Sequence, residues 1–194
     1  MRRFSVIPAG RLVLALGLLA VSGPAASCQL NSRTASVAIT ATLAESLTVA
    51  ATPGAVTFNL VSGGKATGSA PITITTTWAM TRGRSTVTLT GYFSSSAAAL
   101  TSGGTSPANI PTSDVFAEVT TGTPTTWTAF TQSPRRNGLG VSGASLVLFT
   151  QTIAAANRSS SRTDDLSLQI NLSSNPQLPA GQYTGTLNLQ AQDL

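Results

Sequence analysis

The chain has 194 residues, of which 9% are charged, and it contains one cysteine and no histidine. Average domains carry about 25% charged residues, so Ser, Thr, Asn, Gln and Gly must keep this surface in water. The missing histidine excludes Ser-His-Asp and Cys-His catalysis and the usual zinc sites, and the single cysteine excludes a disulfide within the chain. The composition therefore predicts a protein that is not an enzyme and that uses no cofactor and no metal.

The first 27 residues have the pattern of an export signal. Arg2, Arg3 and Arg11 precede an apolar run at 12–21, and small residues follow it. This order is typical of a signal peptide, so we expect residues 1–27 to be removed and 28–194 to form the exported domain. Removal takes three of the eleven basic residues, and the net charge falls from +5 to +2. We expect the protein in the periplasm, on the outer membrane surface or outside the cell.

The only cysteine stands directly after the predicted signal peptide. Ala25-Ala26-Ser27-Cys28 resembles the processing box of bacterial lipoproteins, with Ala25 at the position where Leu is usual. A lipid on Cys28 would make the protein a membrane-anchored envelope lipoprotein. The alternative is ordinary cleavage at the same small residues, which leaves a thiol at the new N-terminus.

The exported part alternates between apolar and polar residues. The clearest alternation covers 37–43, 72–80, 87–93, 166–172 and 183–189, and weaker strands are expected at 47–49, 56–60, 115–119, 126–131 and 146–153. A period of two predicts antiparallel sheets with one face in water. About eight or nine strands in one domain predict an all-β fold, a single immunoglobulin-like antiparallel β-sandwich, with a closed barrel as the second choice. Between them, 94–113 reads as a long Ser/Gly/Pro loop.

The two ends of this domain carry a family resemblance. Ser36-Val37-Ala38-Ile39-Thr40-Ala41-Thr42-Leu43 is a detached alternating strand soon after the signal. At the other end, Leu178-Pro179-Ala180-Gly181-Gln182-Tyr183-Thr184-Gly185-Thr186-Leu187 is similar to the closing "Pro-Ala-Gly-x-Tyr-x-Gly" strand of exported subunits. Together these segments resemble pilin or spore-coat-U-type subunits assembled by chaperone–usher systems. Many such subunits have a disulfide, which this chain cannot form, so the cysteine-free types are the nearer comparison.

The resemblance implies a non-catalytic structural or assembly subunit of the bacterial cell envelope or surface. In such subunits the sandwich lacks a strand, and the N-terminal strand of a neighbour fills the gap by β-strand addition. Val37, Ile39, Ala41 and Leu43 would be the inserting side chains here. The implied partners are like subunits and a periplasmic chaperone and usher. The alternative is that 36–43 is the first strand of its own complete sandwich, and a lipid on Cys28 would oppose a polymer.

A second class of function is a surface adhesion or glycan-binding module. Arg82, Arg84, Arg135 and Arg136 fall in predicted turns, and Trp127 is the tryptophan expected at the surface, since Trp78 follows the apolar register of its strand. Turns that share one end of a sandwich would form a ligand patch for an acidic surface glycan. The simpler interpretation is that exposed charges stand where water is. The chain lacks the interleaved basic and aromatic residues typical of nucleic-acid binding.

Overall fold

The computed structural model describes residues 32–134 and 138–194. The chain divides between Ala41 and Thr42 into two units, and Thr42–Leu194 holds all of the described strands. The strands are β1 (Ser46–Thr52), β2 (Lys65–Thr67), β3 (Ile72–Ala79), β4 (Thr86–Tyr92), β5 (Leu100–Ser102), β6 (Asn109–Ile110), β7 (Val115–Val119), β8 (Thr128–Ala129), β9 (Ser145–Thr152), β10 (Ser159–Asn171), β11 (Tyr183–Thr184) and β12 (Asn188–Asp193). Short 3₁₀ turns occur at Thr112–Asp114, Ala155–Asn157 and Leu172–Ser174.

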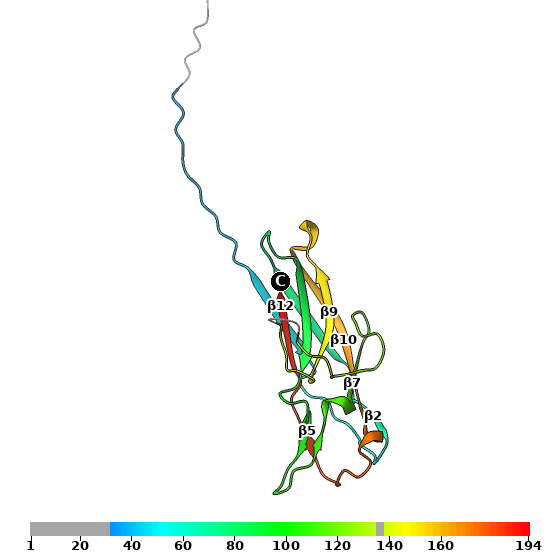
Figure 1. Cartoon of the computed structure of the whole chain (residues 1–194). Coiled ribbons are helices and arrows are strands. Elements are labelled where there is room, and N and C mark those ends of the chain that lie inside the picture. Colours follow the sequence, from blue (N-terminus) through cyan, green and yellow to red (C-terminus); the bar gives the residue numbers. More distant parts are fainter. Residues whose placement is uncertain (1–31, 135–137) are drawn as a thin grey trace, which may run out of the picture. The chain divides into compact units, whose positions relative to one another are not determined.

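The strands form three antiparallel sheets. The largest has the order β1-β3-β10-β7-β8, and β2 pairs with the C-terminal end of β10. The other two have the orders β12-β4-β9 and β11-β5-β6. Figure 1 shows β12 running up to the C-terminus, with β4 between it and β9, and β5 at the opposite end. The predicted all-β fold with antiparallel sheets is confirmed, and within the described ranges every sheet is open, with strands at its edges.

The period of two sorts the side chains of each long strand between core and solvent. On β3, Ile72, Ile74 and Trp78 are buried, whereas Thr73 and Thr77 are exposed. Trp78 is only 3% exposed, and its indole N–H donates to the carbonyl oxygen of Asn157 at 2.8 Å. An indole that is buried with its N–H satisfied is a stable core residue, as the sequence predicts.

Four of the predicted strands differ in the structure. Residues 37–43 form no strand, 56–60 keep the alternation without a strand partner, and 183–189 divides into β11 and the start of β12. The segment at 126–131 shortens to β8. Conversely, the predicted loop at 94–113 contains β5 and β6. A strand is defined by its ladder as much as by its sequence, and the first three of these segments lack a ladder partner along part or all of their length.

Candidate functional site: an open apolar groove

A groove of about 780 Å³ opens into the interior between two segments that are far apart in the sequence. Its first rim, 53–60, continues directly from β1, which ends where Pro53 follows Thr52 through a cis peptide bond. Val56, Phe58 and Leu60 are half-buried on this rim and alternate with exposed residues. Ser69 holds the segment, since its N–H donates to the carbonyl of Thr57 at 2.9 Å.

The second rim is 181–189, which contains β11 and the start of β12. Here Tyr183, Leu187 and Leu189 are half-buried, and Gly185 occupies the position between them in the same register. A Cβ on Gly185 would lie 2.0 Å from the carbonyl oxygen of Ala99, so only glycine lets the backbone approach β5 this closely. The resemblance at this end of the chain therefore rests on a residue with a clear steric role.

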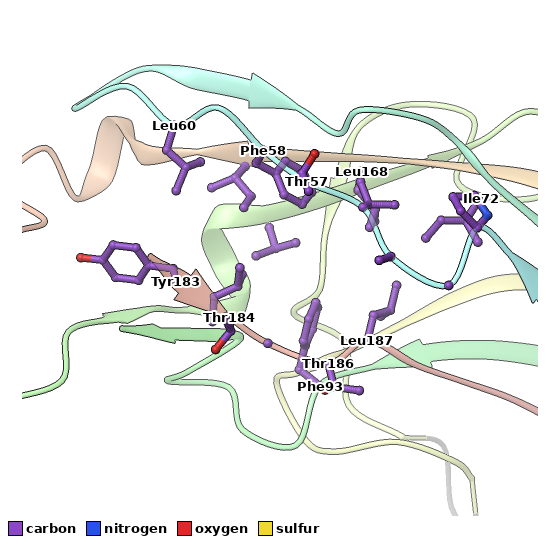
Figure 2. Close-up of a pocket in the computed structure, with 18 of the residues that line it drawn as sticks. Thr57, Phe58, Leu60, Ile72, Phe93, Leu168, Tyr183, Thr184, Thr186 and Leu187 are labelled. Atoms are coloured by element: carbon purple, nitrogen blue, oxygen red, sulfur yellow. The ribbon is translucent and has the colours of Figure 1, made fainter. Parts of the chain in front are cut away.

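The floor of the groove is the hydrophobic core itself. Figure 2 shows Phe58 and Leu60 on one side of the space, Thr184 and Leu187 on the other, and Ile72, Phe93 and Leu168 beside it. The remaining floor residues are also apolar and come from several strands: Leu100, Val115 and Ile170. Phe93 packs edge-on against Phe130, with ring centroids 5.1 Å apart. Apolar residues that line an open space are costly in water, and such a space is typical of a binding groove.

The backbone at both rims is at the edge of its sheet. β1, which leads into the first rim, is the last strand of the six-stranded sheet, and β11 and β12 are each the last strand of a three-stranded sheet. Within the described chain, no strand pairs with either rim across the groove. Unpaired N–H and C=O groups at such an edge are a template for another strand.

The segment Ser36–Leu43, which we call the N-terminal arm, has the alternating pattern of a strand but no strand partner in the part of the chain that the structure describes. It forms no strand, and Val37, Ile39 and Leu43 are 84%, 90% and 86% exposed. Ala41 is exposed as well. The arm thus offers alternating apolar side chains and an unpaired backbone, but within the described residues it has no partner for either.

The chain that follows the arm is held by a cluster of polar contacts. The carboxylate of Glu45 accepts hydrogen bonds from the N–H of Thr81 at 2.9 Å, from its hydroxyl at 2.6 Å, and from Arg84 at 3.3 and 3.1 Å. Arg84 also forms an ion pair with Asp193 at 2.8 Å. The bonds from Arg84 and then Thr81 lower the pKa of Glu45 from 4.5 to about 2, because donors that bind a carboxylate stabilise its ionised form.

Of the residues predicted for a glycan patch, the structure describes Arg82, Arg84 and Trp127, and it places them in different parts of the domain. Arg82 and Arg84 lie in the β3–β4 turn, whereas Trp127, 37% exposed, precedes β8. β10 and β7 separate β3 from β8 in the sheet. Arg135 and Arg136 lie outside the described residues, as does Cys28, the candidate for lipidation.

An ion pair with a buried carboxylate lies within the sandwich. Asp164 is 2% exposed, and its carboxylate accepts bonds from Arg162 at 2.8 to 3.0 Å and from the hydroxyl of Thr121. The Arg162 guanidinium lies 4.7 Å from the centroid of the Phe149 ring. This pair fastens the loop after β7 to β10 and has a structural role.

Comparison of the chain with protein-family models, with curated proteins and with solved structures gives no match. In the ranges 32–134 and 138–194, no helix is long and apolar enough to cross a membrane. The same ranges contain no cluster of three or more His, Cys, Asp or Glu side chains that could bind a metal.

The sequence resemblance implied a sandwich that lacks a strand, but the location of the groove and the contacts of Glu45 were not predicted. The first rim was detectable in part, because Val56, Phe58 and Leu60 alternate as in a strand. What the sequence did not reveal is that this segment forms no strand and has no ladder partner among the described residues. Glu45 gave no signal of its own, because its partners Thr81 and Arg84 are more than thirty residues away.

Proposed function

We propose that the protein is a non-catalytic structural subunit of the bacterial cell envelope or surface, pilin-like in its assembly. Its sandwich is immunoglobulin-like and incomplete, and the groove takes the N-terminal arm of a second copy of the chain. The observation that carries this proposal is the pairing of an apolar, strand-deficient groove with an alternating, exposed arm in one chain. β-strand addition satisfies both, because it supplies a ladder and buries alternate side chains.

The arm and the groove match in length and in pattern. The arm has eight residues and so does the rim 53–60, and at about 3.3 Å per residue each spans about 26 Å as a strand. Every second residue of the arm is apolar, and the alternating half-buried residues of the rims are apolar too: Val56, Phe58, Leu60, Tyr183, Leu187 and Leu189. An inserted arm would therefore direct Val37, Ile39, Ala41 and Leu43 toward the core and leave Ala38 and Thr40 facing outward.

The groove favours an arm from another copy over the chain's own. β1 lies between β3, with which it pairs, and β12, which it contacts, and the arm joins β1 at Ser46, the end away from the groove. To enter its own groove, the arm would have to reverse and pass along β1, where both sides are occupied. A second copy meets no such obstacle.

The same contacts set the direction of insertion. The groove extends from Ala51 and Leu189, next to β1 and β12, which contact each other, to Leu60 and Gly181 at the far ends of the two rims. The donor's own sandwich follows Leu43 closely, so we expect Leu43 at the far end, away from β1 and β12. The arm then runs antiparallel to 181–189, which is the more stable type of pairing.

An exported chain with an open apolar groove needs protection before it meets the next subunit, since exposed edges and apolar patches cause aggregation. This favours a periplasmic chaperone that occupies the groove first, as the family resemblance implies. An usher would then release subunits for assembly at the outer membrane.

The test compares two substitutions on opposite faces of the arm, made in the full chain. Both Ile39 and Thr40 are exposed, so neither substitution disturbs the sandwich. After refolding by dilution, Ile39→Asp is expected to stay monomeric, because it would place a carboxylate in the apolar groove. Thr40→Asp is expected to form fibres like the unmodified chain. Size-exclusion chromatography with light scattering and electron microscopy measure the outcome.

The proposal is wrong if the unmodified chain remains monomeric under these conditions, or if the two variants assemble to the same extent. Equal assembly would mean that the alternation in the arm does not select which side chains are buried.

A further inference from the structure

Among the contacts outside the groove, the cluster around Glu45 is the most specific. Three donor groups of two residues, the backbone N–H and hydroxyl of Thr81 and the guanidinium of Arg84, converge on one carboxylate. Thr81 and Arg84 flank the two central residues of the turn between β3 and β4. Glu45 itself precedes the first residue of β1 and follows the arm after one residue, Ala44.

The turn that holds Glu45 is fixed to the rest of the sandwich. Ser85 and Thr86 donate their N–H groups to the carbonyl of Leu194 at 2.6 and 3.2 Å, and the N–H of Leu194 donates to Thr86 at 3.0 Å. On the other side, Met80 donates to the carbonyl of Arg158 at 2.8 Å. The carboxylate of Glu45 is therefore bound to a part of the molecule that four different strands hold in place.

We propose that Glu45 is a positioning residue for assembly, which fixes the point and direction at which the arm leaves the sandwich. This inference rests on the proposed function, since it concerns the arm as a donor strand. In an assembled fibre, Leu43 would lie in the groove of one subunit while Glu45 is bound to the turn of the next. Only Ala44 then separates two fixed points, and two residue steps span at most about 7 Å.

A link this short makes the joint between subunits stiff. A chain with several unrestrained residues between two domains behaves as a flexible linker, whose ends adopt many separations and directions. Binding of Glu45 removes that freedom at the donor side, and insertion of the arm removes it at the acceptor side. The Glu45 cluster therefore determines how far one subunit bends relative to the next.

The experiment measures fibre stiffness and groove binding separately. Fibres of the full chain, of Glu45→Gln and of Asp193→Asn are imaged by electron microscopy, and their persistence lengths are compared. Asp193→Asn is the matched control, because it removes the other carboxylate bound to Arg84 but leaves the donors of Glu45 in place. Each variant is also tested for binding of a synthetic peptide with the sequence 34–45, which needs only the groove.

We expect Glu45→Gln to lower the persistence length about twofold or more, because the linker gains unrestrained residues, and Asp193→Asn to leave it unchanged. Peptide binding should be the same in all three proteins. Glu45→Gln chains that bind the peptide but form no fibres would also support the inference, since the groove would be intact and the donor no longer presented.

Fibres of Glu45→Gln as stiff as the unmodified ones would overturn the inference while leaving the proposed function intact. Absence of fibres and of peptide binding in the unmodified chain would instead refute the proposed function. Should Glu45→Gln fail to fold, Thr81→Val decides the question, because it deletes one donor and keeps Arg84. Unchanged stiffness in Thr81→Val would then overturn the inference.

Discussion

A monomer with an empty groove should be stabilised by the arm supplied as a peptide. The Ile39→Asp chain is the suitable acceptor, because its own arm is not expected to enter the groove of another copy. A peptide of residues 34–45 present at a hundred times its Kd stabilises the folded state by about 2.7 kcal/mol. In a chain of this size each kcal/mol raises Tm by about 2–4 °C, so the expected rise is about 5–11 °C.

The peptide sequence provides the control. Burial of an isoleucine side chain contributes about 1.5–3 kcal/mol, so a peptide with Ile39→Asp loses at least that much and should bind at least about 10- to 150-fold more weakly. A peptide with Thr40→Asp should bind like the original, because residue 40 faces outward. Thermal unfolding followed by circular dichroism measures all three peptides.

Two results would refute the reasoning. A peptide of residues 34–45 that leaves Tm unchanged at saturating concentration would show that the groove does not accept this strand. An Ile39→Asp peptide that raises Tm as much as the original would show that the arm is bound without burying its apolar face.

Three further predictions concern the stability of the folded domain. Gly185→Ala places a Cβ 2.0 Å from a carbonyl oxygen, whereas the Cβ of Gly181→Ala meets nothing within 4 Å. Measured by urea denaturation, Gly185→Ala should lower the free energy of unfolding by about 1–3 kcal/mol or more. Gly181→Ala should leave it nearly unchanged. Trp78→Phe deletes a buried indole and its hydrogen bond, and should cost about 1–3 kcal/mol in the same assay, so an unchanged midpoint would contradict its core role. Because the pKa of Glu45 is lowered from 4.5 to about 2, its contribution to stability is complete above pH 4.5 and is lost as the pH falls to 2. The Tm difference between the unmodified chain and Glu45→Gln should therefore shrink between pH 4.5 and pH 2. A constant difference would argue against the bound carboxylate.

Most of the fold follows from alternation in the sequence. β3, β4 and the C-terminal half of β10 were predicted from a period of two, and β7 and β9 were predicted as weaker strands. In β3, β7 and the C-terminal half of β10, buried residues alternate with partly exposed ones. Trp78 was placed in the core by the same register. The short strands β2, β5 and β6 were not predicted, although each of them has a partner within the chain.

The groove marks the limit of this reasoning. Segments 56–60 and 183–189 alternate as clearly as a strand, yet much of their length has no ladder partner. Sequence periodicity reports which face of a segment is apolar, but it does not report whether another strand lies beside it. Whether a segment has a neighbour depends on the long-range pairing of β1 with β3 and of β12 with β4. Within the described ranges, this pairing leaves the outer edges of β1 and β12 without a strand partner.

The site at Glu45 was inaccessible for a different reason. Its partners are an alcohol and a guanidinium in a turn, and neither residue type at that spacing forms a recognisable motif. The arm, in contrast, was identified because four apolar residues at alternate positions stand apart from the rest of the domain, soon after the predicted signal peptide.

The outer faces of the sheets have a consequence for the conditions that the protein tolerates. Hydroxyl groups pair across strands there, as in Thr75 with Thr163 at 3.2 Å and Thr88 with Thr150 at 3.3 Å. Contacts between uncharged groups are not screened by dissolved ions, unlike ion pairs at a surface. Hydrogen bonds of this kind should therefore contribute about equally to the free energy of unfolding at low and at high salt concentration.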